Sequence, residues 1–285
     1  MTPVGTNLRD RSAAERAPSA WCTACLDEYS NVLLAAETLA PKPGRRYSTQ
    51  MSITIIAHRA CPLDAPENSL AGIRKAAELG ADGVEIDLRR TLDCVPVLMH
   101  DWSPWRTTRL PGPVRLYPSF LLRRLRLQRT DDRVPTLAEA LDALPDGLFI
   151  AIEMKEASTA PRALRLIRGR PLNGRALVWS YREEALRYVA RKAPEIETAL
   201  LRDDLDPEGL RRFLEDAERF GARAISPHWA AINPQFVGEA HDRGLRVYAM
   251  NRDMESVAKK AACGVDGIVT DNPREVRAIL QPAGS

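Results

Sequence analysis

The order of apolar and helical segments in this 285-residue chain predicts an α/β fold, a TIM (β/α)8 barrel. From residue 53 onward, short apolar runs alternate with segments whose apolar residues recur at helical spacing. Eight runs are almost continuously apolar, which is typical of parallel strands covered by helices on both faces. Repeated strand–helix units over about 235 residues match the length of one such barrel. A doubly wound open sheet is the alternative, but no GxGxxG or GxxxxGKS/T motif follows any run, so nucleotide binding has no support.

The eight principal strands are predicted where aliphatic and β-branched residues cluster. The first two are ITIIA at 53–57 and DGVEIDLR at 82–89. VPVLMHD at 95–101 is an additional extended piece after the second strand. The remaining strands are expected to begin at residues 148, 176, 196, 223, 245 and 266.

Helices are predicted between the strands. SLAGIRKAAEL at 69–79 has helical spacing, with Ser69 as its N-cap. TLAEALDAL at 136–144 begins with a capping box formed by Thr136 and Glu139. The irregular, basic segment 108–134 is expected to form a long loop with a short helix near the barrel mouth, its arginines on the solvated surface. Further helices are expected at 182–193, 207–220, 234–243, 254–262 and 273–280.

The composition indicates an ordinary soluble globular protein, with 45% apolar and 28% charged residues. The net charge of +3 is too small and too evenly spread to indicate nucleic acid binding. No apolar run reaches the roughly 18 residues of a spanning helix, so we expect no stable membrane insertion. The N-terminus lacks the apolar stretch of a signal peptide, and an odd number of cysteines, five, argues against a disulfide framework. We therefore expect a cytoplasmic protein, and these features leave its oligomeric state undefined.

Residues 1–50 differ in composition from the rest and end in the breaker-rich PKPGRRYSTQ. We expect a disordered or loosely attached extension, or a misplaced start with Met51 as the true first residue, followed by one domain over 51–285. The extension contains Cys22 and Cys25 as a CxxC pair. The chain has neither the second ligand pair of a structural zinc site nor, around this pair, the βαβ context of a thioredoxin motif, so we interpret both as plain thiols.

Two carboxylates in the second strand are expected to point into the barrel. Glu85 and Asp87 are two residues apart and share one side of the strand. The apolar Val84, Ile86 and Leu88 point the other way, toward the helices. Carboxylates aimed into a barrel interior are unfavourable unless a cation meets them, and a divalent metal would meet both.

The strand at 148–155 carries a matching polar pair, Glu153 and Lys155, near its end. Glu153 can supply a third carboxylate, and Lys155 can supply charge balance or a phosphate contact. Three carboxylates with open positions suit a hard cation, either Mg²⁺ or Ca²⁺. The alternative is a structural ion-pair network at the mouth, and the two histidines nearby favour the metal.

Two histidines stand at the ends of extended segments, beside these acidic groups. His58 directly follows the first strand, and His100 ends the piece at 95–101. Imidazole gives and takes protons near neutral pH, and Arg59, beside the first histidine, is suited to bidentate phosphate recognition. His241 is expected on the surface, and His228 has a weak claim on the mouth by its position. The set suits hydrolysis of a phosphate ester around a metal.

Several segments together resemble the glycerophosphodiester phosphodiesterase family in order and spacing over about 53–280. The sequence departs from the family pattern in several places: a leucine is common where Pro104 stands, the C-terminal motif has Tyr248 and lacks its usual tryptophan, and Ala60 and Cys94 stand where a glycine is usual. None touches a proposed ligand or proton carrier. The matching segments are AHRA at 57–60, APENS at 65–69, GADGVEIDLRRTLDCVPVLMHD at 80–101, RTT at 106–108, VPTLAEAL at 134–141, IEMK at 152–155 and GVDGIVTDNP at 264–273.

The resemblance implies a TIM barrel that holds one divalent cation and hydrolyses a small glycerophosphodiester to glycerol 3-phosphate and an alcohol. The nucleophile is either water or the neighbouring glycerol hydroxyl, and either histidine can be the base. The residues implied are Glu85, Asp87 and Glu153 for the metal, His58 and His100 for acid–base catalysis, and Arg59 and Lys155 for the phosphate.

Two other functions stay open at this point. The nearest is a lysophospholipase D, with the same chemistry on a lipid head group. An apolar patch around the mouth would favour it, with Trp102, Trp105, Leu121 and Leu122 as its candidates. The other is a catalytically silent barrel that acts as a binding protein, against which the complete set of proposed catalytic residues argues.

Overall fold

The structure is a computed structural model that describes residues 53–281 except 129 and 252. The predicted extension at 1–50, with Cys22 and Cys25, and the proposed start at Met51 lie outside the described residues.

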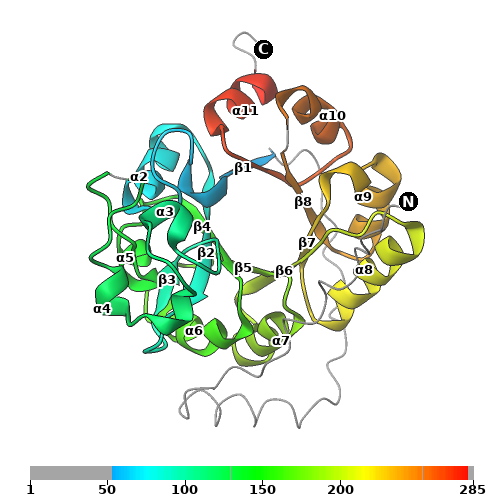
Figure 1. The fold of residues 1–285 in the computed structure, drawn as a ribbon. Helices are drawn as coiled ribbons and strands as arrows, with labels where there is room; N and C mark the ends of the chain where they lie inside the picture. Colours follow the sequence, from blue (N-terminus) through cyan, green and yellow to red (C-terminus); the bar gives the residue numbers. More distant parts are fainter. Residues whose placement is uncertain (1–52, 129, 252, 282–285) are drawn as a thin grey trace, which may run out of the picture. The chain divides into compact units, whose positions relative to one another are not determined.

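Eight parallel strands close into a ring, with the helices around its outside (Figure 1). The first strand pairs with the last, Ile56 opposite Val269, and also with the second, Ile56 opposite Gly83, and these pairings close the sheet. This confirms the TIM barrel, and the open doubly wound sheet is wrong. The strands of the ring are β1 (Thr54–Ala57), β2 (Gly83–Arg90), β4 (Phe149–Met154), β5 (Ala176–Ser180), β6 (Glu197–Arg202), β7 (Ala224–Pro227), β8 (Arg246–Met250) and β9 (Gly267–Thr270).

The extended piece predicted at 95–101 forms β3 (Pro96–Leu98), which runs antiparallel to the end of β2. Leu88 lies opposite Leu98 in this pair. The chain therefore turns back along β2 before the next barrel strand, and this return places His100 beside the carboxyl end of β2.

The predicted helices are present, with both predicted caps. The Ser69 hydroxyl accepts a hydrogen bond from the Gly72 N–H, and Thr136 and Glu139 form the capping box. Besides the single turn α3, one helix of the described residues was not predicted: α6 (Ala160–Arg168), which has Pro161 in its first turn. The others are α2 (Leu70–Glu78), α5 (Leu137–Asp142), α7 (Glu183–Lys192), α8 (Pro207–Arg219), α9 (Pro234–Asp242), α10 (Val257–Ala262) and α11 (Pro273–Leu280), with short 3-10 turns η1 (His58–Ala60), η3 (Ala157–Thr159), η4 (Trp229–Ala231) and η5 (Met254–Ser256).

The segment predicted at 108–134 as a basic loop with a short helix contains η2 (Val114–Leu116) and the short helix α4 (Ser119–Leu122), and α3 (Trp105–Thr108) ends at its first residue. Its inner side forms a small apolar core of its own against β3. Leu122 is fully buried in this core, so its assignment to a patch at the mouth is wrong. The core residues are Val97, Met99, Val114, Leu122, Leu127 and Val134.

The barrel interior is apolar on the side of β5 to β8 and polar beside β2. Ala151 packs among apolar side chains of the other strands, and Glu153, two residues further along β4, shares its face. Glu153 lies opposite Asp87 of β2 in the register. Between residues 53 and 281, leaving out 129 and 252, there is no helix with the length and apolarity needed to span a membrane.

Candidate active site

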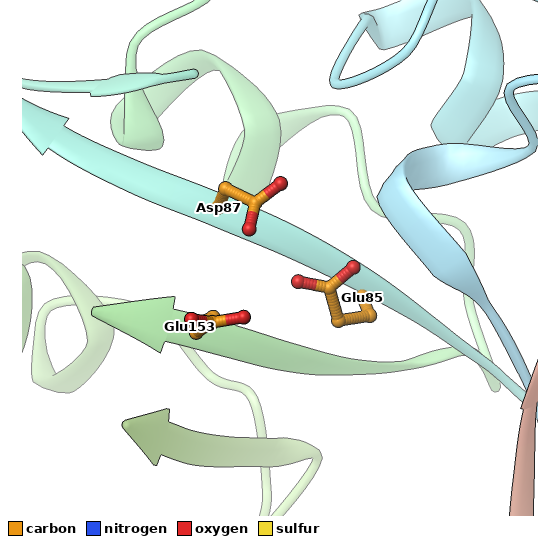
Figure 2. Close-up of side chains that lie close together, drawn as sticks. All are labelled: Glu85, Asp87 and Glu153. Carbon is orange, nitrogen blue, oxygen red and sulfur yellow. The ribbon is translucent and has the colours of Figure 1, made fainter. Parts of the chain in front are cut away.

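Three buried carboxylates converge between β2 and β4 (Figure 2). Glu85, Asp87 and Glu153 are 2%, 1% and 8% exposed, and one oxygen from each lies within 4.8 Å of the others. Their proximity follows from the sheet, since Glu85 and Asp87 alternate along β2 and the register sets Glu153 opposite Asp87. The structure thus brings together the three residues that the sequence predicts as metal ligands.

The protonation of the cluster follows from burial and from the two cations beside it. Burial raises the pKa of Glu85 well above its usual range, and the Asp87 and Glu153 carboxylates raise it further. Burial also raises the pKa of Glu153, and Lys155 counteracts this in part. For Asp87, burial acts in the same direction, but Lys155, His100 and Asn68 outweigh it and lower the pKa. The surroundings therefore do not stabilise all three carboxylates in their charged form, and a further cation would.

Lys155 and Arg59 supply positive charge to the cluster. The Lys155 Nζ lies 2.9 Å from Asp87 Oδ1 and 2.6 Å from Glu153 Oε1. The Arg59 Nε lies 3.7 Å from Asp87 Oδ2, and its backbone N–H donates to Glu85 Oε2 at 2.7 Å. If all three carboxylates are ionised, as a bound metal would favour, the two cations leave one negative charge for the metal to balance. The Glu85 Oε1 and Arg59 Nε atoms are buried and have no hydrogen-bond partner. A divalent cation fits this oxygen-only donor set.

A left-handed turn after β1 presents Arg59 to the cluster. Arg59, Ala60 and Cys61 have φ of 43°, 58° and 59°, a region where side chains other than glycine are strained. Cys94, the other position where the family usually has glycine, has φ of 59°. Both departures therefore put a side chain where the backbone favours glycine, and the Ala60 turn carries that strain directly beside the site.

Each predicted catalytic histidine is held by an aspartate through Nδ1. The His58 Nδ1 lies 2.7 Å from Asp271 Oδ1, and the His100 Nδ1 lies 2.8 Å from Asp101 Oδ1. An engaged Nδ1 leaves Nε2 as the nitrogen that can exchange protons with a ligand. Burial lowers the pKa of His100 despite the nearby Asp87 carboxylate. Of the remaining histidines, His241 is exposed and pairs with Asp266, as its predicted surface position suggests.

Arg106 connects the His100–Asp101 pair to a buried carboxylate. Its Nε donates to Asp101 Oδ2 at 2.7 Å, and its two Nη atoms donate to the Glu67 carboxylate at 2.5 and 2.7 Å. Glu67 is 6% exposed. The next residue, Asn68, donates to Asp87 Oδ2 at 2.8 Å, so one short loop braces both a histidine and a carboxylate of the cluster.

Sequence reasoning assigned no role to these bracing residues, Glu67, Asn68, Asp101, Arg106 and Asp271. All of them lie in the segments that carry the family resemblance, so the signal was present. The sequence does not show which of these residues pair with one another, because the partners are up to 213 residues apart in the chain.

A cavity of about 680 Å³ opens beside His100. Trp102 and Trp105 line it together with Asp101 and Arg106, and the two indoles are 62% and 52% exposed. A molecule whose phosphate lies at the carboxylate cluster can extend an alcohol group into this space. His228, at the end of β7, does not line the cavity.

A parallel barrel with buried carboxylates and two aspartate-held histidines at the carboxyl ends of its strands is the arrangement of a hydrolytic TIM-barrel enzyme. The Glycerophosphoryl diester phosphodiesterase family model matches residues 58–275 of the chain. The chain belongs to this family and is a phosphodiester hydrolase that acts on glycerophosphodiesters.

Relatives of known name and structure agree with this assignment. A glycerophosphodiester phosphodiesterase of Caldanaerobacter subterraneus is 28% identical over 247 residues, which cover 82% of this chain and 100% of the relative. A solved structure of a putative glycerophosphoryl diester phosphodiesterase from Silicibacter pomeroyi has a TM-score of 0.72 at 26% identity, covering 80% of this chain and 93% of that one. A phosphodiesterase from Oleispira antarctica, solved in complex with the product sn-glycerol-3-phosphate, has a TM-score of 0.73 at 25% identity and covers 79% of this chain and 95% of its own.

Proposed function

We propose that the enzyme hydrolyses glycerophosphodiesters to glycerol 3-phosphate and an alcohol with one divalent cation and two histidines. The observation that carries this is the buried cluster of three carboxyl groups beside two aspartate-held histidines. The Oleispira antarctica relative, which binds sn-glycerol-3-phosphate, supports glycerol 3-phosphate as the product here. The family membership and the full residue set oppose the alternative of a catalytically silent barrel.

Glu85, Asp87 and Glu153 would hold the cation. When bound, Mg²⁺ or Ca²⁺ supplies Lewis-acid polarisation of a phosphoryl oxygen. Oxygen-only ligands suit either ion, so ligand type does not distinguish them. Mg²⁺ requires near-octahedral geometry and Ca²⁺ accepts flexible coordination, so the affinities of the site for the two ions should differ.

Arg59 and Lys155 bind the phosphate and stabilise the charge that grows on it. The Arg59 Nε has no hydrogen-bond partner and is buried, so a phosphate oxygen would satisfy it. Lys155 is already held at the cluster by two carboxylates, and the attraction of these carboxylates raises its pKa against the opposing effect of burial. It therefore stays charged in a site from which water is largely excluded, where its attraction to phosphate is strong.

His58 and His100 share the proton transfers. One Nε2 accepts a proton from the nucleophile, and the other donates one to the leaving alkoxide. Asp271 and Asp101 keep the rings oriented and favour the Nδ1–H form of each. The nucleophile is water, or the adjacent glycerol hydroxyl with a cyclic phosphate as the first product.

The first test is hydrolysis of glycerophosphocholine by the full chain in EDTA and after addition of Mg²⁺ or Ca²⁺. We expect no turnover in EDTA, recovery with one of the ions, and losses of about 10²- to 10⁴-fold in His58→Ala and in His100→Ala. His241→Ala, which changes an exposed histidine, is the matched control and should keep full activity. Full activity in EDTA, or in either of the first two variants, would overturn the mechanism.

A second assay assigns the roles of the histidines. A diester with a nitrophenolate leaving group needs no protonation as it departs. The variant that lacks the general acid should recover most of its activity on this substrate, whereas the variant that lacks the base should not. Phosphorus NMR during turnover reveals a cyclic glycerol phosphate if the glycerol hydroxyl is the nucleophile.

A lysophospholipase D activity is the second candidate, favoured by the cavity that Trp102 and Trp105 line beside His100. In that reaction the acylated glycerol keeps the phosphate and the head-group alcohol leaves, so the acyl chain of the glycerol part would contact both indoles there. Rates on lysophosphatidylcholine and glycerophosphocholine separate the two functions. If the cavity takes the lipid, Trp102→Ala/Trp105→Ala lowers kcat/KM for lysophosphatidylcholine and leaves the rate on glycerophosphocholine unchanged.

A further inference from the structure

The segment 102–130 combines exposed apolar side chains with a strong local positive charge. Its 29 residues contain seven arginines and no aspartate or glutamate. The whole chain has a net charge of +3, so the other residues together carry a net charge of −4. This basic character is therefore local to the segment beside the barrel mouth.

Part of this segment forms one surface, the rim patch, composed of Trp102, Trp105, Arg109, Arg115 and Leu116. The two tryptophans line the same cavity. The Arg109 guanidinium lies 5.9 Å from the centre of the Trp105 ring. Val114, next to Arg115, donates its backbone N–H to the Trp102 carbonyl at 2.8 Å. These contacts place Arg109 against Trp105, and the turn that carries Arg115 and Leu116 beside Trp102, next to the opening that the two tryptophans line.

The apolar members of the rim patch do not belong to the core beneath them. Trp102, Trp105 and Leu116 are 62%, 52% and 60% exposed. Val114 and Leu122 of the same segment are buried in the small core against β3. The segment is thus anchored by one side and displays its largest apolar side chains on the other, which is typical of an interaction surface.

The two arginines of the patch have no acidic partner among the residues that the structure describes. Arg109 and Arg115 are exposed, and neither forms an ion pair with another described residue. By contrast, Arg123 and Arg126 of the same segment pair with Glu139 and Asp131. Two unpaired arginines beside two exposed indoles match the chemistry of an anionic bilayer surface, where tryptophan prefers the interface and arginine is attracted to the lipid phosphates.

We propose that the rim patch docks on anionic phospholipid surfaces and turns the opening beside His100 toward the bilayer. Nucleic acid fits the patch less well, because its affinity depends on the number of phosphate contacts and the patch offers two unpaired arginines. Insertion at a lipid interface depends instead on apolar area, which the patch offers through three large side chains. Docking is a property of the surface and does not require turnover, so it goes beyond the proposed function.

The test is sedimentation of the full chain in EDTA with vesicles of phosphatidylcholine alone or mixed with phosphatidylglycerol. We expect binding to the mixed vesicles, weakened by salt and accompanied by a blue shift of tryptophan emission. Arg109→Gln/Arg115→Gln should bind about 25-fold more weakly, since each arginine near an anionic surface contributes about fivefold to binding. Trp102→Ser/Trp105→Ser should abolish the blue shift and reduce binding to both kinds of vesicle.

Arg211→Gln/Arg212→Gln is the control, because it removes two exposed arginines from α8. It should bind vesicles like the wild type.

Circular dichroism melting shows that each variant is folded. Absence of binding to the mixed vesicles, equal binding by the Arg109/Arg115 variant, or binding to single-stranded DNA but not to vesicles would overturn the proposal. So would a dimer that the tryptophan substitutions dissociate without any vesicle binding. None of these outcomes depends on hydrolysis, which is scored separately on soluble glycerophosphocholine.

Discussion

The two sides of the barrel interior differ in chemistry. The side built by β1, β2 and β4, with the return through β3, carries all seven predicted site residues. The side built by β5 to β8 contributes apolar groups such as Leu177, Trp179, Ala199 and Tyr248. Grouping the charges on neighbouring strands lets two cations meet three carboxylates, while the apolar side excludes water. The charged side chains and most of the apolar interior therefore lie on different parts of the barrel, and substitutions in each part can test whether stability and chemistry separate in the same way.

The largest effect is expected on the charged side. Glu85→Gln should lower kcat/KM by about 10³-fold or more, because it removes one metal ligand and a charge that holds the cation. The same variant should stabilise the metal-free protein by about 1 kcal/mol, because a buried carboxylate that two others repel is replaced by a neutral group. Calorimetric binding of the metal and thermal melting in EDTA measure the two effects.

A loss of both activity and metal-free stability in Glu85→Gln would contradict this separation, since it would make Glu85 a structural residue. Glu78→Gln is the control, because Glu78 is an exposed partner of Lys75 on α2. It should change neither quantity measurably.

On the apolar side, Leu177→Ala should reduce the free energy of unfolding by about 2–5 kcal/mol, since Leu177 is 4% exposed and its loss leaves a cavity. Its kcat per folded molecule should stay close to that of the wild type. Urea unfolding and an active-site titration measure these quantities. A large fall in kcat without a loss of stability would show that the apolar side shapes the site directly.

The alternation of side chains along a strand allowed the carboxylates of the charged side to be predicted from the sequence. Alternation along β2 places Glu85 and Asp87 on one face, and the position of Glu153 in its own strand suggests the third carboxylate. The bracing pairs could not be predicted in this way, because Glu67 and Arg106 are 39 residues apart and meet only through packing of two loops. A periodic pattern reports the direction of a side chain and carries no information on its partner.

The missed helix α6 has a different cause. Its apolar face, Ala160, Ala163, Leu164 and Ile167, has helical spacing, and Pro161 stands in the first turn where proline is favourable. Arginines stand between these apolar positions, so the helical spacing is not evident when only a few residues are considered at a time. A count of apolar positions at i, i+3, i+4 and i+7 would have found it.

Arg106 sharpens the comparison within the charged side, since it reaches His100 through Asp101. Arg106→Gln should lower kcat by about 10- to 100-fold, the range for residues that orient a functional group, with little change in KM. In a His100→Ala background it should cause no further loss. A further loss there would show that Arg106 acts through another route. Arg109→Gln, on the same segment, is the control.

The pH dependence of stability gives a second measure of this link. Burial would raise the pKa of Asp101, but hydrogen bonds from Arg106 and His100 outweigh it and lower that pKa to about 2. A carboxyl whose folded pKa is below its unfolded value near 4 stabilises the fold above that pH, and the contribution is lost as the pH falls toward 2. With partial exposure, about 1 kcal/mol is expected. The difference between wild type and Asp101→Asn should therefore shrink between pH 4 and pH 2.

The smallest effect concerns the strained turn that leads from β1 into the charged side. Ala60 has φ of 58° and is fully buried, with its methyl group beside Gly72. Ala60→Gly removes the left-handed strain of about 1–2 kcal/mol but adds backbone freedom to the unfolded chain, so a net gain of about 0.5–1 kcal/mol is expected. Ala77→Gly, in helix α2, should destabilise by a similar amount. Urea unfolding at neutral pH compares the two. A loss of stability in Ala60→Gly would mean that the packing of its methyl group outweighs the strain. The turn beside Arg59 would then be held by contacts, as the apolar side of the barrel is.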